Sequence, residues 1–257
     1  MPAPRSLAER MQDGDCVYGL FVFSPDPAHT EIAGIAGFDF VIVDLEHAPL
    51  CVQDVLGHVR AAAGTGLSVI VRVADDTPAA VARLLDAGVS GIVFPHVGLS
   101  LGRTGAALSA LRYAPVGDRP ACTGVRAAGY GLDPFADYVE RANHTTLAIG
   151  LIEDVAVVDR LDAVLSSVRL DVVMPGPGDL AASLGRPGQL THPRVRAEVD
   201  RIVDAVQARK GCSIGAYVGS TAEAAEWRKR GATFIAYSID YKILSATLRE
   251  IREALPD

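Results

Sequence analysis

The stretch FVIVDLEHAPL, residues 40–50, joins a run of apolar residues to a group of ionisable ones. Its first four residues are Phe, Val, Ile and Val, a composition that favours a buried β-strand. Asp44, Glu46 and His47 follow at once, where an ordinary exposed turn would use Gly, Asn or Ser. The pattern therefore predicts a strand whose carboxyl end holds catalytic or ligand-binding side chains.

Seven further runs rich in Val, Ile and Phe recur along the 257-residue chain, separated by Ala-, Leu- and Arg-rich segments with helical spacing. This alternation predicts parallel strands joined by crossover helices. Together the runs number eight, the strand count of a (β/α)8 TIM barrel. They start at Val17, Phe40, Leu67, Gly91, Leu147, Val172, Ser213 and Thr233.

Two intervals between these runs are longer than one strand, one turn and one helix require. The starts are separated by 23, 27, 24, 56, 25, 41 and 20 residues. The interval of 56 contains RYAPVGDRPACTGVRAAGYG, residues 112–131, which we expect to form a long loop insertion before a helix near residues 133–142. The interval of 41 holds a smaller loop, SLGRPGQLTHP, at residues 183–193.

No composition break or linker divides the chain, so we expect residues 1–257 to form a single barrel domain. A doubly wound open sheet is the competing fold, because it uses the same alternation of strands and helices. Its glycine-rich GxGxxG after the first strand is missing, and FVFSPDP, residues 21–27, stands there instead. The barrel is therefore favoured.

The composition argues against several classes of protein. The net charge is −7 with acids and bases interspersed, so the chain lacks the basic patch of a nucleic-acid-binding protein. The four cysteines lie far apart and form no CxxC pair, which indicates a reducing compartment. No apolar run approaches the roughly 18 residues of a membrane span, and the first residues contain no signal-peptide core. We expect a cytoplasmic protein that binds neither nucleic acid nor membrane.

Ionisable or polar side chains follow several of the predicted strands at the end where a barrel carries its active site. A single acid there could simply cap a helix, but groups from several strands that face one end of a barrel predict a common site. These residues are Asp44, Glu46 and His47, then Arg72, Glu153, Asp154, Asp179, Ser238 and Asp240.

Glu153 and Asp179 end adjacent predicted strands, so their carboxylates can converge on one point. Two like charges that lie close together repel, and Mg²⁺ or Mn²⁺ relieves this repulsion while leaving positions for water and substrate oxygens. The pair therefore predicts an open metal site. The alternative is that either acid forms an ordinary salt bridge with Arg72 or another arginine.

The segment PGPGD, which places Gly176, Pro177 and Gly178 before Asp179, is predicted to bind substrate together with Arg72. The glycines allow close approach of a ligand, and the N-terminus of the following helix favours an anion. A tight turn that needs glycine is the alternative. The guanidinium of Arg72 suits an oxyanion or the carbonyl of an oxo acid.

His47 is the candidate catalytic base, because imidazole exchanges protons near neutral pH. Asp44, three residues earlier, is expected to orient the His47 ring. The alternative is a structural histidine that is hydrogen-bonded or faces solvent. His96 ends the fourth predicted strand and is a second-rank candidate.

Several motifs, taken in order, resemble those of the metal-dependent class II pyruvate aldolases typified by 4-hydroxy-2-oxoheptanedioate aldolase and 2-dehydro-3-deoxyglucarate aldolase, in the citrate lyase β-chain superfamily. The resemblance covers nearly the whole chain. Its most specific pieces are DLEHAP (44–49), VIVR (69–72), RYAPVGDR (112–119), Glu153 and PGPGDLAASLG (175–185).

This resemblance implies a pyruvate-binding (β/α)8 barrel in which Glu153 and Asp179 bind Mg²⁺, Mn²⁺ or Co²⁺. It further implies that Arg72 stabilises an enolate oxygen and that His47, assisted by Asp44, acts as base through a water molecule. The reaction would be reversible cleavage of a 4-hydroxy-2-oxo acid to pyruvate, or a similar 2-oxo acid, and an aldehyde. Family members are typically hexamers built from dimers that exchange a C-terminal helix, here SATLREIREAL at residues 245–255.

Two positions depart from the family pattern. Leu151 stands where a glutamine is usual, and Pro120 replaces the glycine that follows the loop arginine. These departures keep two alternatives open: a citrate-synthase-like or decarboxylating synthase that forms a carbon–carbon bond, and a barrel that binds an oxo acid without turnover.

Overall fold

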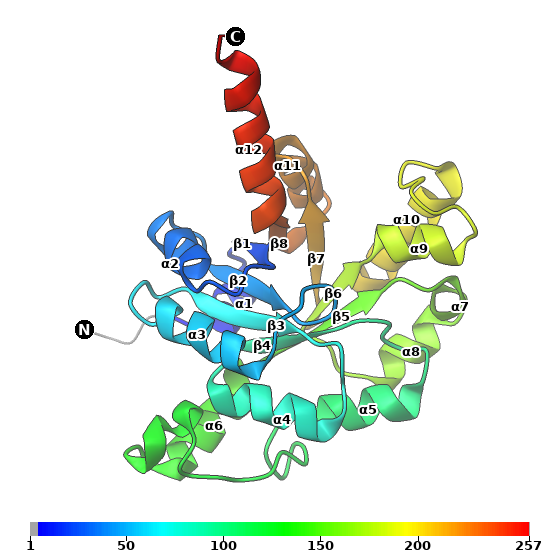
Figure 1. The fold of residues 1–257 in the computed structure, drawn as a ribbon. Coiled ribbons are helices and arrows are strands. Elements are labelled where there is room, and N and C mark those ends of the chain that lie inside the picture. The colour runs from blue at the N-terminus through cyan, green and yellow to red at the C-terminus, as the bar shows by residue number, and fades with distance from the viewer. Residues whose placement is uncertain (1–4, 257) are drawn as a thin grey trace.

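The computed structural model describes residues 5–256 and contains a closed barrel of eight parallel strands in the order β1 to β8 (Figure 1). All eight predicted strands are confirmed, and the closed barrel excludes the doubly wound alternative. The strands are β1 (Val17–Val22), β2 (Phe40–Asp44), β3 (Ser68–Arg72), β4 (Gly91–Phe94), β5 (Leu147–Ile152), β6 (Val172–Pro175), β7 (Ser213–Val218) and β8 (Ala232–Ile239).

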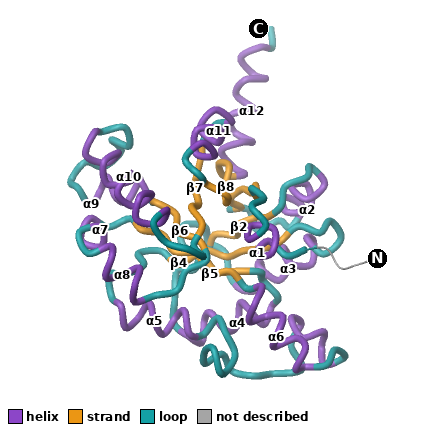
Figure 2. Tube along the Cα trace, turned by 180° about the vertical axis from the view of Figure 1, so that it is seen from behind, coloured by secondary structure: helices purple, strands orange, loops and turns teal. Residues whose placement is uncertain are grey.

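Helices surround the barrel and connect successive strands (Figure 2). Local sequence sets several of their ends: α4, for example, begins after the N-cap Thr77 with proline in its first turn and ends at Gly88, whose φ of 100° suits glycine. The helices are α1 (Leu7–Gln12), α2 (Ala28–Ile35), α3 (Val52–Ala62), α4 (Pro78–Ala87), α5 (Leu101–Ser109), η1 (Arg126–Gly131), α6 (Phe135–Thr145), α7 (Val155–Val158), α8 (Leu161–Ser167), α9 (Pro177–Ser183), α10 (Pro193–Gln207), α11 (Thr221–Lys229) and α12 (Asp240–Ala254).

Large apolar side chains fill the barrel interior, so the barrel is a packed core. The rings of Phe40 and Phe234 stack there with their centroids 4.1 Å apart. A Cβ atom at position 19 would overlap the ring of Phe40, which explains the glycine in β1. The chemistry is therefore restricted to the strand ends and the loops beyond them.

The long insertion packs beneath the barrel. It contains η1, and the helix expected near residues 133–142 is α6, which begins two residues later and ends three residues later than predicted. Tyr113 and Tyr138 pack edge to face in a small apolar cluster of the insertion. Arg119 is buried beside them, with its guanidinium 4.6 Å from the ring centroid of Tyr113. The insertion is thus an ordered part of the fold that shares a small apolar core with α6.

Helix α12 extends away from the barrel (Figures 1 and 2). Within the described chain, Asp240 is its one buried residue. Its exposed apolar side chains are Tyr241, Ile243, Leu244, Leu248 and Ile251. A helix that leaves this much apolar surface in water lacks its packing partner.

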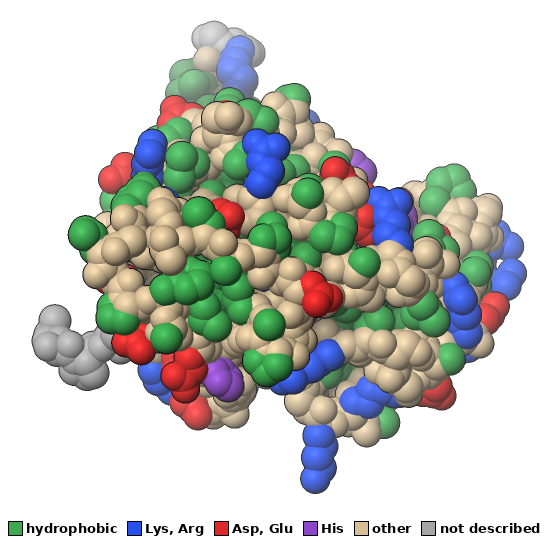
Figure 3. All heavy atoms as spheres, turned by 90° about the horizontal axis from the view of Figure 1, so that it is seen from below, with side chains coloured by type: hydrophobic (Ala, Val, Ile, Leu, Met, Phe, Trp, Pro, Cys, Tyr) green, Lys and Arg blue, Asp and Glu red, His purple; other side chains and the backbone are tan. Residues whose placement is uncertain are grey.

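The rest of the surface is mixed. On the face that Figure 3 shows, acidic and basic side chains are interspersed with hydrophobic ones. Among residues 5–256, no helix combines the length and the apolar character that crossing a membrane requires.

Candidate active site

A cavity of about 280 Å³ opens at the carboxyl ends of the strands. Its walls include seven residues that the sequence singled out, contributed by segments at the ends of β2, β3, β5 and β6. They are His47, Arg72, Glu153, Gly176, Pro177, Gly178 and Asp179. The fold therefore brings together side chains that lie up to 132 positions apart in the sequence.

Arg72 lies in a cluster of acids at one side of this cavity. Its Nε donates to Asp44 Oδ1 at 3.0 Å and lies 3.3 Å from Glu46 Oε2, and its Nη2 makes a second, shorter bond with Asp44 Oδ2. Burial alone would lower the pKa of Arg72, but the bond with Asp44 and the nearby negative charges raise it. The guanidinium is therefore held rigidly and remains charged.

Asp44 does not orient His47 as the sequence suggested. Its fully buried carboxylate binds Arg72, and Oδ1 also accepts the backbone N–H groups of Glu46 at 2.9 Å and His47 at 3.4 Å. Asp44 and Arg72 are direct neighbours in the β2–β3 register, which brings the two side chains together. The expectation of an Asp44–imidazole pair is therefore corrected to an Asp44–Arg72 pair.

The His47 side chain is 57% exposed, and its nearest acidic partner is Glu46, whose Oε2 lies 3.8 Å from Nε2. That distance is too long for a hydrogen bond. The ring lines the cavity but is not fixed by a buried partner. It is consequently free to meet a ligand or a water molecule in the cavity.

Glu153 is buried just beyond the end of β5. Its Oε1 accepts the backbone N–H of His96 at 2.8 Å. Burial raises the pKa of Glu153 to about 7, and the negative charges of Asp179 and Glu46 add to this effect, while His96 opposes it. A buried carboxylate that is destabilised by neighbouring acids is a favourable place for a cation.

His96 lies beside Glu153. Its φ of 51° is a left-handed conformation that is uncommon outside glycine. Its Nδ1 lies 3.0 Å from Asp154 Oδ2 and 3.5 Å from Glu153 Oε1. Burial would lower the pKa of His96, but the hydrogen bond with Asp154 and the charge of Glu153 raise it. His96 therefore supports Glu153 from outside the cavity.

Asp179 lies in the first turn of α9, exposed at the cavity mouth. No side chain caps this helix at Gly176, and a Cβ at Gly176 would lie 2.7 Å from Glu153 Cβ and even closer to Oε2. A Cβ at Gly178 would meet no atom within 4 Å. Gly176 is therefore required by Glu153, whereas Gly178 leaves open space beside the cavity.

The donor chemistry fits a hard divalent cation held by few protein ligands. Nowhere in residues 5–256 do three or more His, Cys, Asp or Glu side chains form a group that could enclose a metal ion. Mg²⁺ typically uses one or two carboxylates and completes its shell with water and substrate oxygens. Glu153 and Asp179 match that pattern.

The sequence did not single out the largely apolar wall of the cavity or the lysine at its rim. Leu151 was noted only as a departure, and its side chain now lies in this wall. Lys242 Nζ lies 3.5 Å from Tyr217 Oη. Two sequence features could have revealed these residues: apolar positions in the strands that face the barrel interior, and a lysine one turn after the last strand. The remaining members are Phe21, Phe23, Met174, Pro175, Leu190, Tyr217 and Ile239.

Two residues predicted at the end of strand eight, Ser238 and Asp240, are not part of the cavity wall. Asp240 is buried and accepts the backbone N–H groups of Phe23 at 3.0 Å and Ser24 at 3.2 Å. Its Oδ2 also lies 2.8 Å from His29 Nδ1. Asp240 thus joins the start of α12 to the end of β1.

Comparison with known proteins gives consistent matches. The model of the HpcH/HpaI aldolase/citrate lyase family matches residues 17–246. A hydroxypyruvate/pyruvate aldolase of Paraburkholderia phytofirmans is 33% identical over 98% of this chain and 96% of its own. A 5-keto-4-deoxy-D-glucarate aldolase of Citrobacter koseri is 32% identical over 96% and 93%. The solved structure of citrate synthase SbnG is 31% identical, with a TM-score of 0.83 over 96% of this chain and 98% of that one.

Proposed function

The chain belongs to the HpcH/HpaI aldolase/citrate lyase family and is an enzyme of the pyruvate aldolase type, and on this basis we propose the reaction that it catalyses. The enolate of pyruvate, or of a similar 2-oxo acid, adds reversibly to an aldehyde to give a 4-hydroxy-2-oxo acid. The observation that carries this proposal is the convergence of His47, Arg72, Glu153 and Asp179 on one cavity.

We propose that Glu153 and Asp179 hold a divalent cation, Mg²⁺, Mn²⁺ or Co²⁺. When bound, such a cation supplies Lewis-acid polarisation of the carbonyl of the oxo acid. Glu153 suits this role because burial and the charge of Asp179 disfavour its ionised form in the absence of a cation. Asp179, at the cavity mouth, leaves space for water and substrate oxygens.

Arg72 is proposed to donate hydrogen bonds to the oxygen that becomes the enolate oxygen. Its guanidinium is already positioned by Asp44, so little reorganisation is needed when negative charge develops. Asp44 thereby acts as a positioning residue for Arg72. The backbone of Gly176, Pro177 and Gly178, at the uncapped start of α9, is proposed to receive the carboxylate of the substrate.

His47 is proposed to remove the methyl proton of the 2-oxo acid, directly or through a water molecule. Its exposed ring lines the cavity and has no buried partner that would occupy its nitrogens. The same group would return the proton in the opposite direction of the reaction. The apolar wall that includes Leu151 is proposed to exclude water from the enolate.

Exchange of the methyl protons of pyruvate in D₂O, followed by NMR, tests this function. Protein stripped with EDTA should be inactive, and Mg²⁺, Mn²⁺ or Co²⁺ should restore the exchange. His47→Ala should abolish exchange but retain metal binding, whereas Glu153→Gln should lose both. Glu140→Gln, an exposed acid on α6, is the matched control and should behave as the wild type. Undiminished exchange in the EDTA-treated protein or in His47→Ala would contradict the proposal.

The likeness to citrate synthase SbnG supports a second candidate, a citrate-synthase-like or decarboxylating synthase that forms a carbon–carbon bond. Leu151 and the Pro120 loop, where the chain departs from the family pattern, are compatible with a different acceptor. Acetyl-CoA consumption or oxaloacetate decarboxylation that is faster than aldol cleavage would favour the synthase. The reverse order of rates would favour the aldolase.

We also propose that the enzyme is a homo-oligomer, a hexamer by analogy with its family, in which α12 packs on a neighbouring subunit. The exposed apolar face of α12 supports this assembly. A largely apolar pocket bordered by Tyr18, Phe38 and Ile235 is a candidate position for the apolar face of a neighbour's α12. The four free cysteines support a reducing, cytoplasmic setting.

A further inference from the structure

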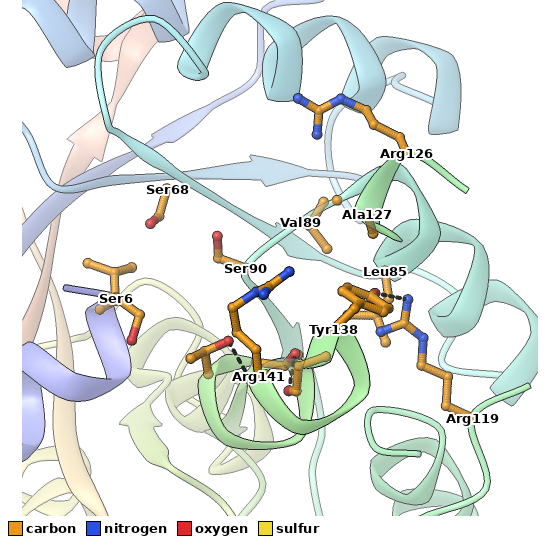
Figure 4. A pocket seen from close by; sticks show the side chains of 15 residues that line it. Ser6, Ser68, Leu85, Val89, Ser90, Arg119, Arg126, Ala127, Tyr138 and Arg141 are labelled. Atoms are coloured by element: carbon orange, nitrogen blue, oxygen red, sulfur yellow. Dashed lines mark hydrogen bonds between the residues drawn. The ribbon is translucent and has the colours of Figure 1, made fainter. Parts of the chain in front are cut away.

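A second pocket, of about 230 Å³, lies at the amino ends of the barrel strands (Figure 4). Ser68, Ser90 and Thr146 line it from the amino ends of β3, β4 and β5. The candidate active site occupies the carboxyl ends of the same barrel. The two cavities are therefore separated by the packed barrel core.

Three arginines line this second pocket, and among the described residues that border it there is no Asp or Glu. Arg119 comes from the insertion, Arg126 from η1 and Arg141 from α6. Arg119 Nη2 donates to Asp86 Oδ1 at 2.8 Å and lies 3.0 Å from Tyr138 Oη, so one of the three charges has an acidic partner. The pocket consequently retains an excess of positive charge.

The other two arginines are not neutralised by acids. Arg126 donates to the carbonyl of Ala87 at 3.4 Å, and within residues 5–256 neither Arg126 nor Arg141 forms a salt bridge. Figure 4 shows the guanidinium of Arg141 extending from α6 toward the opening that Ser90 borders. Both guanidinium groups therefore keep donors available for a ligand.

Hydroxyl groups add neutral donors to the same pocket. The side-chain oxygens of Ser68 and Ser90 make no hydrogen bond to any other part of the described chain, although their backbone N–H groups are paired. Arg119 adds a third observation, because its side chain is 1% exposed and its Nε lacks a partner within the described residues. Unused donors of two chemical kinds thus surround one small cavity.

We propose that this pocket binds a phosphate-type oxyanion, either free phosphate or the phosphoryl group of a small metabolite. Arginine forks match the oxygens of such an anion in geometry and charge. The volume lies below the roughly 300 Å³ of pockets for drug-sized ligands, which favours a small ligand. The bound anion would join α6, and η1 of the insertion, to the amino ends of β3 and β4.

Calorimetric titration of the full-length protein with inorganic phosphate tests the proposal. Saturable binding of one phosphate per chain is expected, and saturating pyruvate with Mg²⁺ should leave its affinity unchanged, since the two cavities are separate. Sodium chloride at equal ionic strength should produce no saturable heat. Phosphate that pyruvate displaces would instead place the anion in the candidate active site and overturn the proposal.

Arg126→Gln and Arg141→Gln each remove one charged donor and should weaken phosphate binding about tenfold or more. Arg196→Gln is the matched control, because Arg196, like Arg141, is an exposed arginine on a helix but lies on α10 outside the pocket. Unchanged affinity in both pocket variants, or an equal loss in the control, would refute the site.

Glycerol 3-phosphate in place of phosphate distinguishes the two sources of the anion. Tighter binding of the ester, reduced again by Ser90→Ala, would assign the pocket to a phosphorylated metabolite. Tighter binding of inorganic phosphate would assign it to the free ion. Absence of saturable binding of both ligands would overturn the proposal.

Discussion

Asp44 and His47 are three residues apart but differ sharply in their surroundings. Asp44 is fully buried against Arg72, whereas the side chain of His47 is 57% exposed. A buried carboxylate that neutralises a cation affects both folding and function, while an exposed imidazole affects chemistry alone. The two residues can therefore be separated by experiment.

Asp44→Asn should lower the free energy of unfolding by about 3 kcal/mol, because it leaves the buried Arg72 without its main counter-charge. His47→Ala should change this free energy by less than about 0.5 kcal/mol. Urea unfolding followed by circular dichroism measures both values. Equal stability of the two variants would contradict the pairing of Asp44 with Arg72.

The raised pKa of Glu153 predicts a pH-dependent stability of the metal-free protein. The folded carboxyl titrates at about 7 and the unfolded one near its ordinary value of 4.5, so the folded state binds the proton more tightly. Stability should therefore fall as the pH rises from about 4 to 8, by about 3 kcal/mol in all. The pKa of His96 is also raised, so His96 contributes a further loss of stability as the pH rises above the ordinary pKa of histidine.

Thermal unfolding in EDTA between pH 5 and 8 measures this effect. Glu153→Gln should flatten the profile below pH 7, because the amide does not titrate. Added Mg²⁺ should stabilise the wild type most at high pH, where the carboxylate is ionised. A profile that rises with pH in the metal-free wild type would contradict the assignment.

The partners of individual side chains were the least predictable feature of the site. Strand ends alone indicated that His47, Arg72, Glu153 and Asp179 would share one face. Whether Asp44 pairs with His47 or with Arg72 is decided by the β2–β3 register, which places Asp44 beside Arg72. Register is a tertiary property, so sequence spacing favoured the wrong partner.

The turn from β6 into α9 is the element on which the position of Glu153 depends most. Gly176→Ala adds a methyl group 2.7 Å from Glu153 Cβ, so the Glu153 side chain must move. Affinity for Mn²⁺ should fall about tenfold. Gly178→Ala, two residues later in open space, is the control and should bind Mn²⁺ normally. Titration calorimetry compares the two, and equal affinities would contradict the close contact of Gly176 with Glu153.

Strands were more predictable than the segments between them. Runs such as SIGAYV and FVIVD match β7 and β2 residue for residue, because burial on both faces demands continuous apolar sequence. The insertion at residues 112–131 offered only its glycines and prolines, which indicate a loop without specifying where it packs. The arginine-lined pocket beneath the barrel was accordingly invisible in the sequence.

At the scale of the whole molecule, the exposed face of α12 determines the expected assembly. Leu248→Asp with Ile251→Asp places two charges on the apolar face and should convert the oligomer to smaller species. Arg249→Gln, an exposed polar change on the same helix, should leave the assembly intact. Light scattering coupled to size-exclusion chromatography measures the masses. A monomeric wild type, or an unaltered mass in the double variant, would contradict the proposed packing.

The anchoring of α12 by Asp240 has a consequence for the kinetics of the enzyme. The first turn of α12 is fixed to the end of β1 and carries Lys242 at the cavity rim, while the rest of the helix lies outside its own barrel. In the proposed oligomer, subunit dissociation would remove the neighbour that packs on α12 and leave the cavity rim that carries Lys242 less well supported, so turnover per subunit should depend on enzyme concentration. Progress curves recorded over serial dilution should show specific activity falling as the enzyme is diluted, with a midpoint that follows the dissociation constant of the oligomer.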